Sequence, residues 1–137
     1  MQHGEVNVSA YKSNRGETTT NIAKREEAAR QLLTRISEME RTYSGESARI
    51  VTVVAGDFNT DKRFASERTF ALLGEKFVWA WENIPLAERV TNPANGRYPD
   101  ACFDGFLVKG IRNFSCKPVA IQGVSDHFPV VLTITID

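Results

Sequence analysis

An apolar run that stops abruptly at polar residues is the feature that most constrains this 137-residue chain. Residues 50–55, Ile-Val-Thr-Val-Val-Ala, are followed directly by Gly56, Asp57, Phe58 and Asn59. Such a run predicts a strand covered on both faces, as in α/β proteins, where ligands bind just beyond strand ends. In extended backbone the side chains of Asp57 and Asn59 would leave the strand on the same side. The run therefore predicts a ligand site or a turn, because Gly, Asp and Asn are also turn formers.

The patterns around this run alternate between helix and strand. Apolar residues at spacings of three, four and seven predict a long helix over residues 18–43, capped by Thr19, Thr20 or Asn21. Its predicted apolar face comprises Ile22, Ala29, Leu32, Leu33, Ile36 and Met39. Its predicted solvated face comprises Lys24, Arg25, Glu26, Arg30, Arg35 and Glu38.

A short helix over residues 66–73, closed by Gly74, and a loop over residues 91–100 complete the pattern. The further strands are predicted over residues 5–11, 76–81, 101–109, 114–122 and 128–136. Trp79 and Trp81 are predicted to serve packing. This order predicts an α/β fold with a mixed sheet.

Composition sets the outer limits. Seventeen basic residues balance seventeen acidic ones, so no cationic face indicates nucleic acid, although a metal-dependent phosphodiester enzyme can recruit phosphate through its cation. No run is long enough to span a bilayer, and we expect no membrane partner. Cys102 and Cys116 are too few for a disulfide framework and are predicted to be buried thiols.

Two further apolar runs contain or adjoin polar residues where apolar residues would be expected. Asp104 stands inside an apolar run, where a carboxylate is disfavoured unless it is exposed or paired. Asp126 and His127 adjoin each other just before the last apolar strand. A histidine in such a place is more often structural than catalytic. If the strand ends converge, however, these groups suit metal-assisted phosphoryl hydrolysis, with carboxylates holding Mg²⁺ and an imidazole serving the transition state.

Three motifs together resemble a known family. The sequences Gly-Asp-Phe-Asn at 56–59, Phe-Asp-Gly-Phe-Leu-Val at 103–108 and Ser-Asp-His-Phe-Pro-Val at 125–130 are similar, in order, to the late motifs of the endonuclease/exonuclease/phosphatase superfamily, which includes deoxyribonuclease I. Residues 11–17 also resemble a Leu-Lys-Ser-Asn stretch of bacterial members. The resemblance covers essentially the whole chain.

The resemblance implies a role for each matching residue. Asp57 would activate water or assist the leaving group and contact the metal, and Asn59 would hold a phosphate oxygen. Asp104 would support His127, which would contact the scissile phosphate. Asp126 would lie at the metal, Mg²⁺ or Mn²⁺. The implied substrate is a phosphate ester, and nucleic acid is one candidate.

The chain also departs from the family pattern. Ala10 stands where the family has a histidine, and no counterpart of the family's metal-binding glutamate precedes it. The resemblance thus implies that residues 1–137 form a single partial domain, the carboxyl-terminal half of a deoxyribonuclease I-like two-sheet sandwich, with a mixed, mostly antiparallel sheet and helices on one face. Its partner would be the missing N-terminal half. An exposed apolar face would favour a homodimer or marginal stability.

Two functions follow as expectations. The first is a fragment of a divalent-metal-dependent phosphodiester hydrolase, weakly active or inactive alone. The alternative is a non-catalytic binding module, or pseudoenzyme, on the same fold, which Ala10 favours. Five polar groups kept at strand ends favour the enzyme, because burial makes such groups costly without a use.

Overall fold

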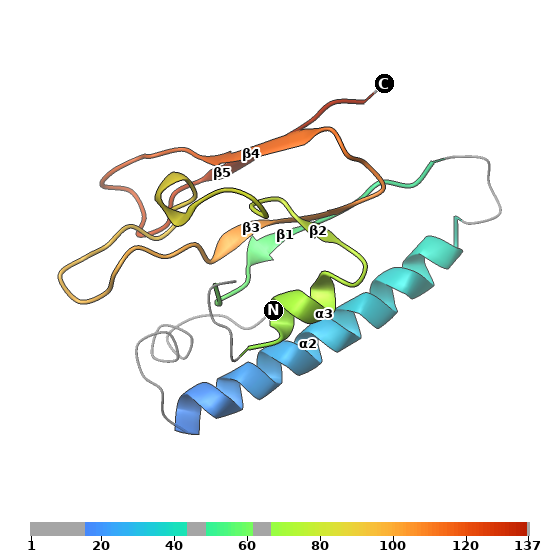
Figure 1. Ribbon diagram of the computed structural model, residues 1–137, viewed down its shortest axis with the longest axis horizontal. Helices are drawn as coiled ribbons and strands as arrows, with labels where there is room; N and C mark the ends of the chain where they lie inside the picture. The colour runs from blue at the N-terminus through green and yellow to red at the C-terminus, as the bar shows by residue number, and fades with distance from the viewer. Residues whose placement is uncertain (1–15, 44–48, 62–66, 137) are drawn as a thin grey trace.

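The computed structural model describes residues 16–43, 49–61 and 67–136, with the backbone alone for residues 16–20. Within them the protein has three layers (Figure 1): helices α2 and α3, a three-stranded sheet, and a two-stranded hairpin on the side away from the helices. This is the predicted α/β class. The predicted strand over residues 5–11 lies outside the described ranges.

Helix α2 (Gly16–Arg41) confirms the predicted long helix. Ala29 and Ile36 of its apolar face are buried, but Met39 is 65% exposed, so the buried face ends before the last turn. The predicted caps are wrong, because the helix already includes Gly16 and continues through Thr19, Thr20 and Asn21.

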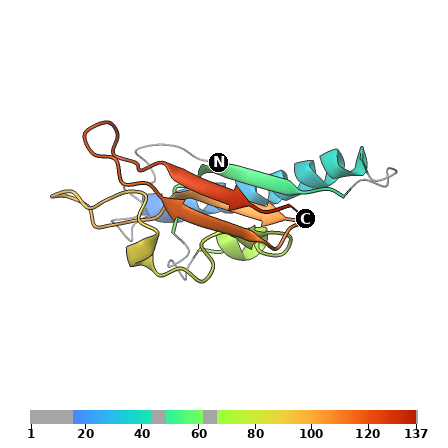
Figure 2. The ribbon, with the colours of Figure 1, turned by 90° about the horizontal axis from the view of Figure 1, so that it is seen from above.

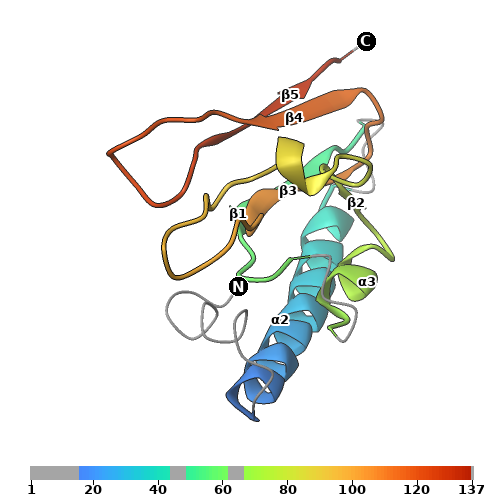
Figure 3. The ribbon, with the colours of Figure 1, turned by 60° about the vertical axis from the view of Figure 1, so that its left-hand side comes forward.

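The predicted solvated face of α2 is wrong at one position. Arg25 is only 2% exposed and forms an ion pair with Glu67. Helix α3 (Thr69–Leu73) follows Glu67 and lies beside α2 (Figure 3), and Gly74 ends it as predicted. The pair therefore joins the two helical segments.

The central sheet has the order β1-β3-β2, with both pairings antiparallel. Strand β1 (Thr52–Asp57) pairs along its full length with β3 (Asp104–Lys109), and β2 (Val78–Trp79) pairs with the other edge of β3. The predicted strand over residues 76–81 is thus shorter than expected, because the backbone turns after Trp79, whose carbonyl accepts from the Glu82 N–H. A 3-10 helix, η1 (Leu86–Glu88), follows.

The second sheet is the hairpin of β4 (Phe114–Pro118) and β5 (Val130–Ile134). Seen from above (Figure 2), it overlies the β1–β3 pair, and β5 contacts β3. Every strand pairing in the described residues is antiparallel. The predicted strand 114–122 is confirmed over its first five residues, and the predicted strand 128–136 over its middle five.

The core lies between the helices and the central sheet. Phe58 packs edge-on against Trp79 with ring centroids 5.1 Å apart, and Trp81 is 1% exposed, which confirms that both tryptophans serve packing. A Cβ on Gly105 would lie 2.5 Å from atoms of both tryptophans, so only glycine fits there. Gly105 thereby lets the indoles lie directly against β3.

The prediction that β1 is covered on both faces is wrong. Val51, just before β1, and Val53 within it are each 39% exposed, and in the described part of the chain β1 pairs on one side only. Val131 of β5 is likewise 43% exposed. These exposed valines give the proposed homodimer an apolar surface, but the dimer itself stays a prediction.

Two smaller expectations concern the membrane and the cysteines. Among the described residues, no helix has the length and apolarity needed to cross a bilayer. Cys102 and Cys116 are free and buried, as predicted. Burial raises the pKa of Cys102 to about 11 and that of Cys116 to about 12. Both thiols therefore stay protonated at neutral pH and are unreactive.

Candidate active site

The register of the central sheet places two carboxylates opposite each other. Asp57, the last residue of β1, pairs with Asp104, the first residue of β3. Residues directly opposite in an antiparallel pair project from the same face, and like charges there are destabilising. The two acids therefore need a compensating positive group. Because β1 and β3 are antiparallel, the site lies at the carboxyl end of β1 and the amino end of β3, not at two carboxyl ends.

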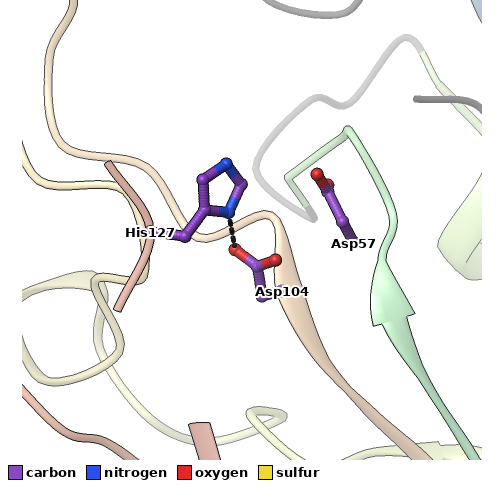
Figure 4. A group of neighbouring side chains, drawn as sticks. All are labelled: Asp57, Asp104 and His127. Carbon is purple, nitrogen blue, oxygen red and sulfur yellow. Dashed lines mark hydrogen bonds and ion pairs between the residues drawn. The ribbon is translucent and has the colours of Figure 1, made fainter. Parts of the chain in front are cut away.

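His127 supplies one such group. It lies in the connection between β4 and β5, and its Nδ1 is 2.8 Å from Oδ2 of Asp104 (Figure 4). One oxygen of Asp57, one of Asp104 and one ring nitrogen of His127 all lie within 4.8 Å of one another. The side chains of His127 and Asp104 are 33% and 19% exposed. The three residues thus converge at a surface that a ligand can reach.

The pKa of His127 reflects these neighbours. The hydrogen bond that His127 donates to the Asp104 carboxylate raises the pKa of His127 above its ordinary value of 6.5. Partial burial opposes this shift, and the negative charges of Asp104, Asp57 and Asp126 add to it. The acidic neighbours therefore stabilise positive charge on the ring whenever His127 is protonated.

Thr91 holds the segments of the site together. Its side chain is fully buried, and its Oγ1 accepts hydrogen bonds from the backbone N–H groups of Phe103 and Asp104, at 3.1 and 3.3 Å. Its carbonyl accepts from the N–H of Phe128, at 2.7 Å. One residue therefore fixes the strand that carries Asp104 against the loop that carries His127.

Asn92 contacts the other nitrogen of the imidazole. Its Nδ2 lies 3.0 Å from Nε2 of His127, and its Oδ1 accepts from Thr91 Oγ1 at 3.1 Å. The backbone of Asn92 forms an isolated bridge with Ala101. Both ring nitrogens of His127 thus have partners within the chain.

Asn59 is arranged differently from the prediction. Its φ of 54° lies in the left-handed region, so the alternation of a strand does not extend from Asp57 to Asn59. Instead its N–H donates to Oδ1 of Asp57 at 2.9 Å, and the intervening Phe58 enters the core. Asn59 is 5% exposed, and its Nδ2 has no partner among the described residues. A buried donor without an acceptor is costly, so this NH₂ group is available to donate to a bound water molecule or ligand.

Asp126, the remaining predicted residue, is exposed and is not a member of the cluster of Asp57, Asp104 and His127. Its negative charge still contributes to the raised pKa of its neighbour His127. Asp126 is thus close enough to act through its charge, while the three other residues provide the converging atoms.

The donor set fits a divalent cation. Carboxylate oxygens suit Mg²⁺ and Mn²⁺, and Mn²⁺ also accepts an imidazole more readily than Mg²⁺ does. Because both nitrogens of His127 have partners, the oxygens of Asp57 and Asp104 are the better candidates to hold the ion.

A cavity of about 510 Å³ lies away from these residues. It is lined by Phe70, Phe77 and Trp79 together with acidic side chains such as Glu67, and none of the clustered residues borders it. Glu67 is already bonded to Arg25. We therefore place the candidate site at the three converging polar residues and not in this cavity.

Sequence reasoning did not find Thr91 and Asn92. Both stand at the start of a segment with two prolines, a glycine and two asparagines, which predicts only a loop.

Comparison with models of known families, with curated proteins and with solved structures gave no match.

Proposed function

We propose that this chain carries catalytic groups of a divalent-metal-dependent phosphodiester hydrolase. The observation that carries the proposal is the convergence of Asp57, Asp104 and His127 from three separate segments. The three motifs that resemble the endonuclease/exonuclease/phosphatase superfamily contribute these same three residues. The finer fold, part of a deoxyribonuclease I-like sandwich, belongs to the same proposal.

Each residue has a role that its surroundings support. Asp57 and Asp104 would hold Mg²⁺ or Mn²⁺ through oxygen, and the cation would supply positive charge that neutralises a phosphate ester. The second oxygen of Asp104 orients His127 through Nδ1. A protonated His127 donates to a phosphoryl oxygen, where negative charge develops. The buried Nδ2 of Asn59 donates to another.

Cation binding tests the proposal most directly. We expect Mn²⁺ and Mg²⁺ to bind the chain in calorimetric titrations, and Asp57→Ala to weaken Mn²⁺ binding at least about tenfold, as loss of a metal partner commonly does. Glu75→Ala is the matched control, because it removes one exposed carboxylate far along the chain from the cluster. Equal affinity in wild type and Asp57→Ala would contradict the proposal.

Turnover is the second test. Cleavage of plasmid DNA and of a bis-aryl phosphodiester is expected to be slow, because Ala10 stands where the resembling family has a histidine. Turnover that requires Mg²⁺ and disappears in Asp57→Ala would support the assigned chemistry. Fast turnover that survives this substitution would assign the hydrolysis to other residues.

The second candidate function is a binding module without catalysis, which Ala10 favours. Alanine at this position cannot transfer a proton, so catalysis would be lost. The remaining polar residues could still bind phosphate. Ala10→His distinguishes the two functions. An enzyme that lacks one imidazole should gain metal-dependent turnover from this change, whereas a binding module should show the same phosphate affinity and no turnover.

A further inference from the structure

We infer that Asn92 is a positioning residue: it holds the His127 imidazole as the Nδ1–H tautomer and covers Nε2 until a phosphoryl oxygen replaces it. The first half of this inference stands on the hydrogen bonds alone. The second half rests on the proposed function, because it names a phosphate ester as the group that displaces Asn92.

The orientation of the Asn92 amide follows from Thr91. Thr91 Oγ1 has two lone pairs, and the N–H groups of Phe103 and Asp104 occupy both. Its own hydrogen must then go to an acceptor, and Oδ1 of Asn92 is 3.1 Å away. The reversed amide would point a third donor at the same hydroxyl. The network therefore directs the NH₂ group of Asn92 toward His127.

The tautomer of His127 follows in turn. A neutral imidazole has one N–H and one bare nitrogen. The Asp104 carboxylate can only accept, so it requires the proton on Nδ1, 2.8 Å away. The Asn92 NH₂ can only donate, so it requires a bare Nε2, 3.0 Å away. Both partners select the same tautomer.

The backbone of Asn92 is fixed as firmly as its side chain. Its N–H donates to the carbonyl of Ala101, and its carbonyl accepts from the N–H of Ala101, each at 2.9 Å. Thr91 immediately before it binds the N–H of Phe128, next to His127. These backbone hydrogen bonds of Thr91 and Asn92 thus hold the Asn92 amide against the His127 ring.

This arrangement has a consequence for the proposed chemistry. A phosphoryl oxygen of a diester accepts hydrogen bonds and cannot donate one, so it binds Nε2 only when that nitrogen carries a proton. The Asn92 NH₂ cannot remain opposite an Nε2–H, because two donors would then face each other. Phosphate binding at His127 must therefore release Asn92, whose NH₂ becomes free to donate to the same phosphate.

Nitrogen NMR tests the resting arrangement without any activity. In ¹⁵N-labelled His3→Gln protein, His127 is the only histidine, since the chain has two. At alkaline pH we expect a protonated Nδ1, a bare Nε2, and a scalar coupling across the hydrogen bond between Asn92 Nδ2 and His127 Nε2. A protonated Nε2 in the neutral ring, or an absent coupling, would overturn the inference, and neither measurement requires a substitution at Asn92 or His127.

Variants at Asn92 sharpen the result. Asn92→Ala should shift the tautomer ratio about fivefold toward Nε2–H, the change that one net hydrogen bond supports. In Asn92→Asp the new carboxylate should accept a hydrogen bond from Nε2–H. His127 should then carry protons on both Nδ1 and Nε2. Asn95→Ala is the matched control, because Asn95 Oδ1 binds only N–H groups of its own loop, those of Arg97 and Tyr98. An unchanged ring spectrum in Asn92→Ala would contradict the inference.

Titration with inorganic phosphate separates this inference from the proposed function. Loss of the Asn92–His127 coupling as phosphate binds supports both. Phosphate that shifts the His127 resonances and leaves the coupling intact overturns the release of Asn92. Absence of any phosphate binding counts against the proposed function, while an intact coupling in the same sample still supports the positioning role.

Discussion

Two acid–base pairs in this protein differ in how completely they are enclosed. In the Arg25–Glu67 pair, Nε lies 2.6 Å from Oε1 and Nη2 lies 3.1 Å from Oε2, and the side chains are only 2% and 3% exposed. The hydroxyl groups of Thr60 and Thr69 also donate to Glu67. The His127–Asp104 pair has one such contact and is partly exposed.

The difference separates a pair that serves the fold from a pair that is accessible to the proposed ligand. Glu67 accepts from one guanidinium and two hydroxyl groups, so its acceptor capacity is used within the protein. Beside His127 a second carboxylate, Asp57, faces Asp104 across the sheet, and the buried Nδ2 of Asn59 has no partner in the described ranges. A saturated pair stabilises the fold, whereas the other pair is partly exposed and lies beside an unsatisfied Asn59 Nδ2.

The largest expected effect is on the enclosed pair. Arg25→Ala should lower the free energy of unfolding by about 3–5 kcal/mol, because it leaves the buried carboxylate of Glu67 without its cation. Urea unfolding followed by circular dichroism measures this change. The control is Arg35→Ala, which breaks an exposed pair with Glu38, with side chains 80% and 48% exposed. It should change stability by less than about 0.5 kcal/mol, and similar losses in the two variants would contradict the comparison.

A smaller loss of stability is expected at the candidate site. Thr91→Val keeps the shape but leaves the N–H groups of Phe103 and Asp104 without their side-chain acceptor. We expect a loss of about 1–3 kcal/mol in the free energy of unfolding, together with weaker Mn²⁺ binding, because Asp104 and His127 are no longer held together. Thr91→Ser keeps the hydroxyl and should preserve the cation affinity. Loss of stability with unchanged Mn²⁺ affinity would show that Thr91 serves the fold alone.

The elements and the three acidic or basic site residues could be predicted because their signals are local. The apolar run before Asp57 is unusual enough to identify β1, and an acid within an apolar strand indicates that Asp104 has a partner. Helix α2 follows from its period. What the sequence could not show is that α2 presents Arg25 to Glu67, 42 positions away. A charged residue at a helical surface position is usually solvated, and only the packing of α3 buries this one.

Thr91 and Asn92 show the other limit. Their contacts with Asp104 and His127 depend on the register between distant segments, which no local pattern encodes. Val53 of β1 shows the same limit in reverse, because a strand buried on both faces and a strand exposed on one face can share one apolar sequence. The candidate site could thus be proposed from the sequence, but the residues that orient it could not.

The smallest expected effect is the pH dependence of the His127–Asp104 pair. Because Asp104 raises the pKa of His127 above 6.5 in the folded protein, the pair stabilises the fold fully below pH 6.5. This contribution is lost as the pH rises through the folded-state pKa, since the folded protein then releases the proton that it held more tightly than the unfolded chain. In Asp104→Asn this stabilising contribution should be absent, so the difference in the free energy of unfolding from wild type should shrink as the pH rises. Urea unfolding over this range measures the difference, with His3→Gln as the control for the other histidine, and a difference independent of pH would contradict a functional imidazolium at this site.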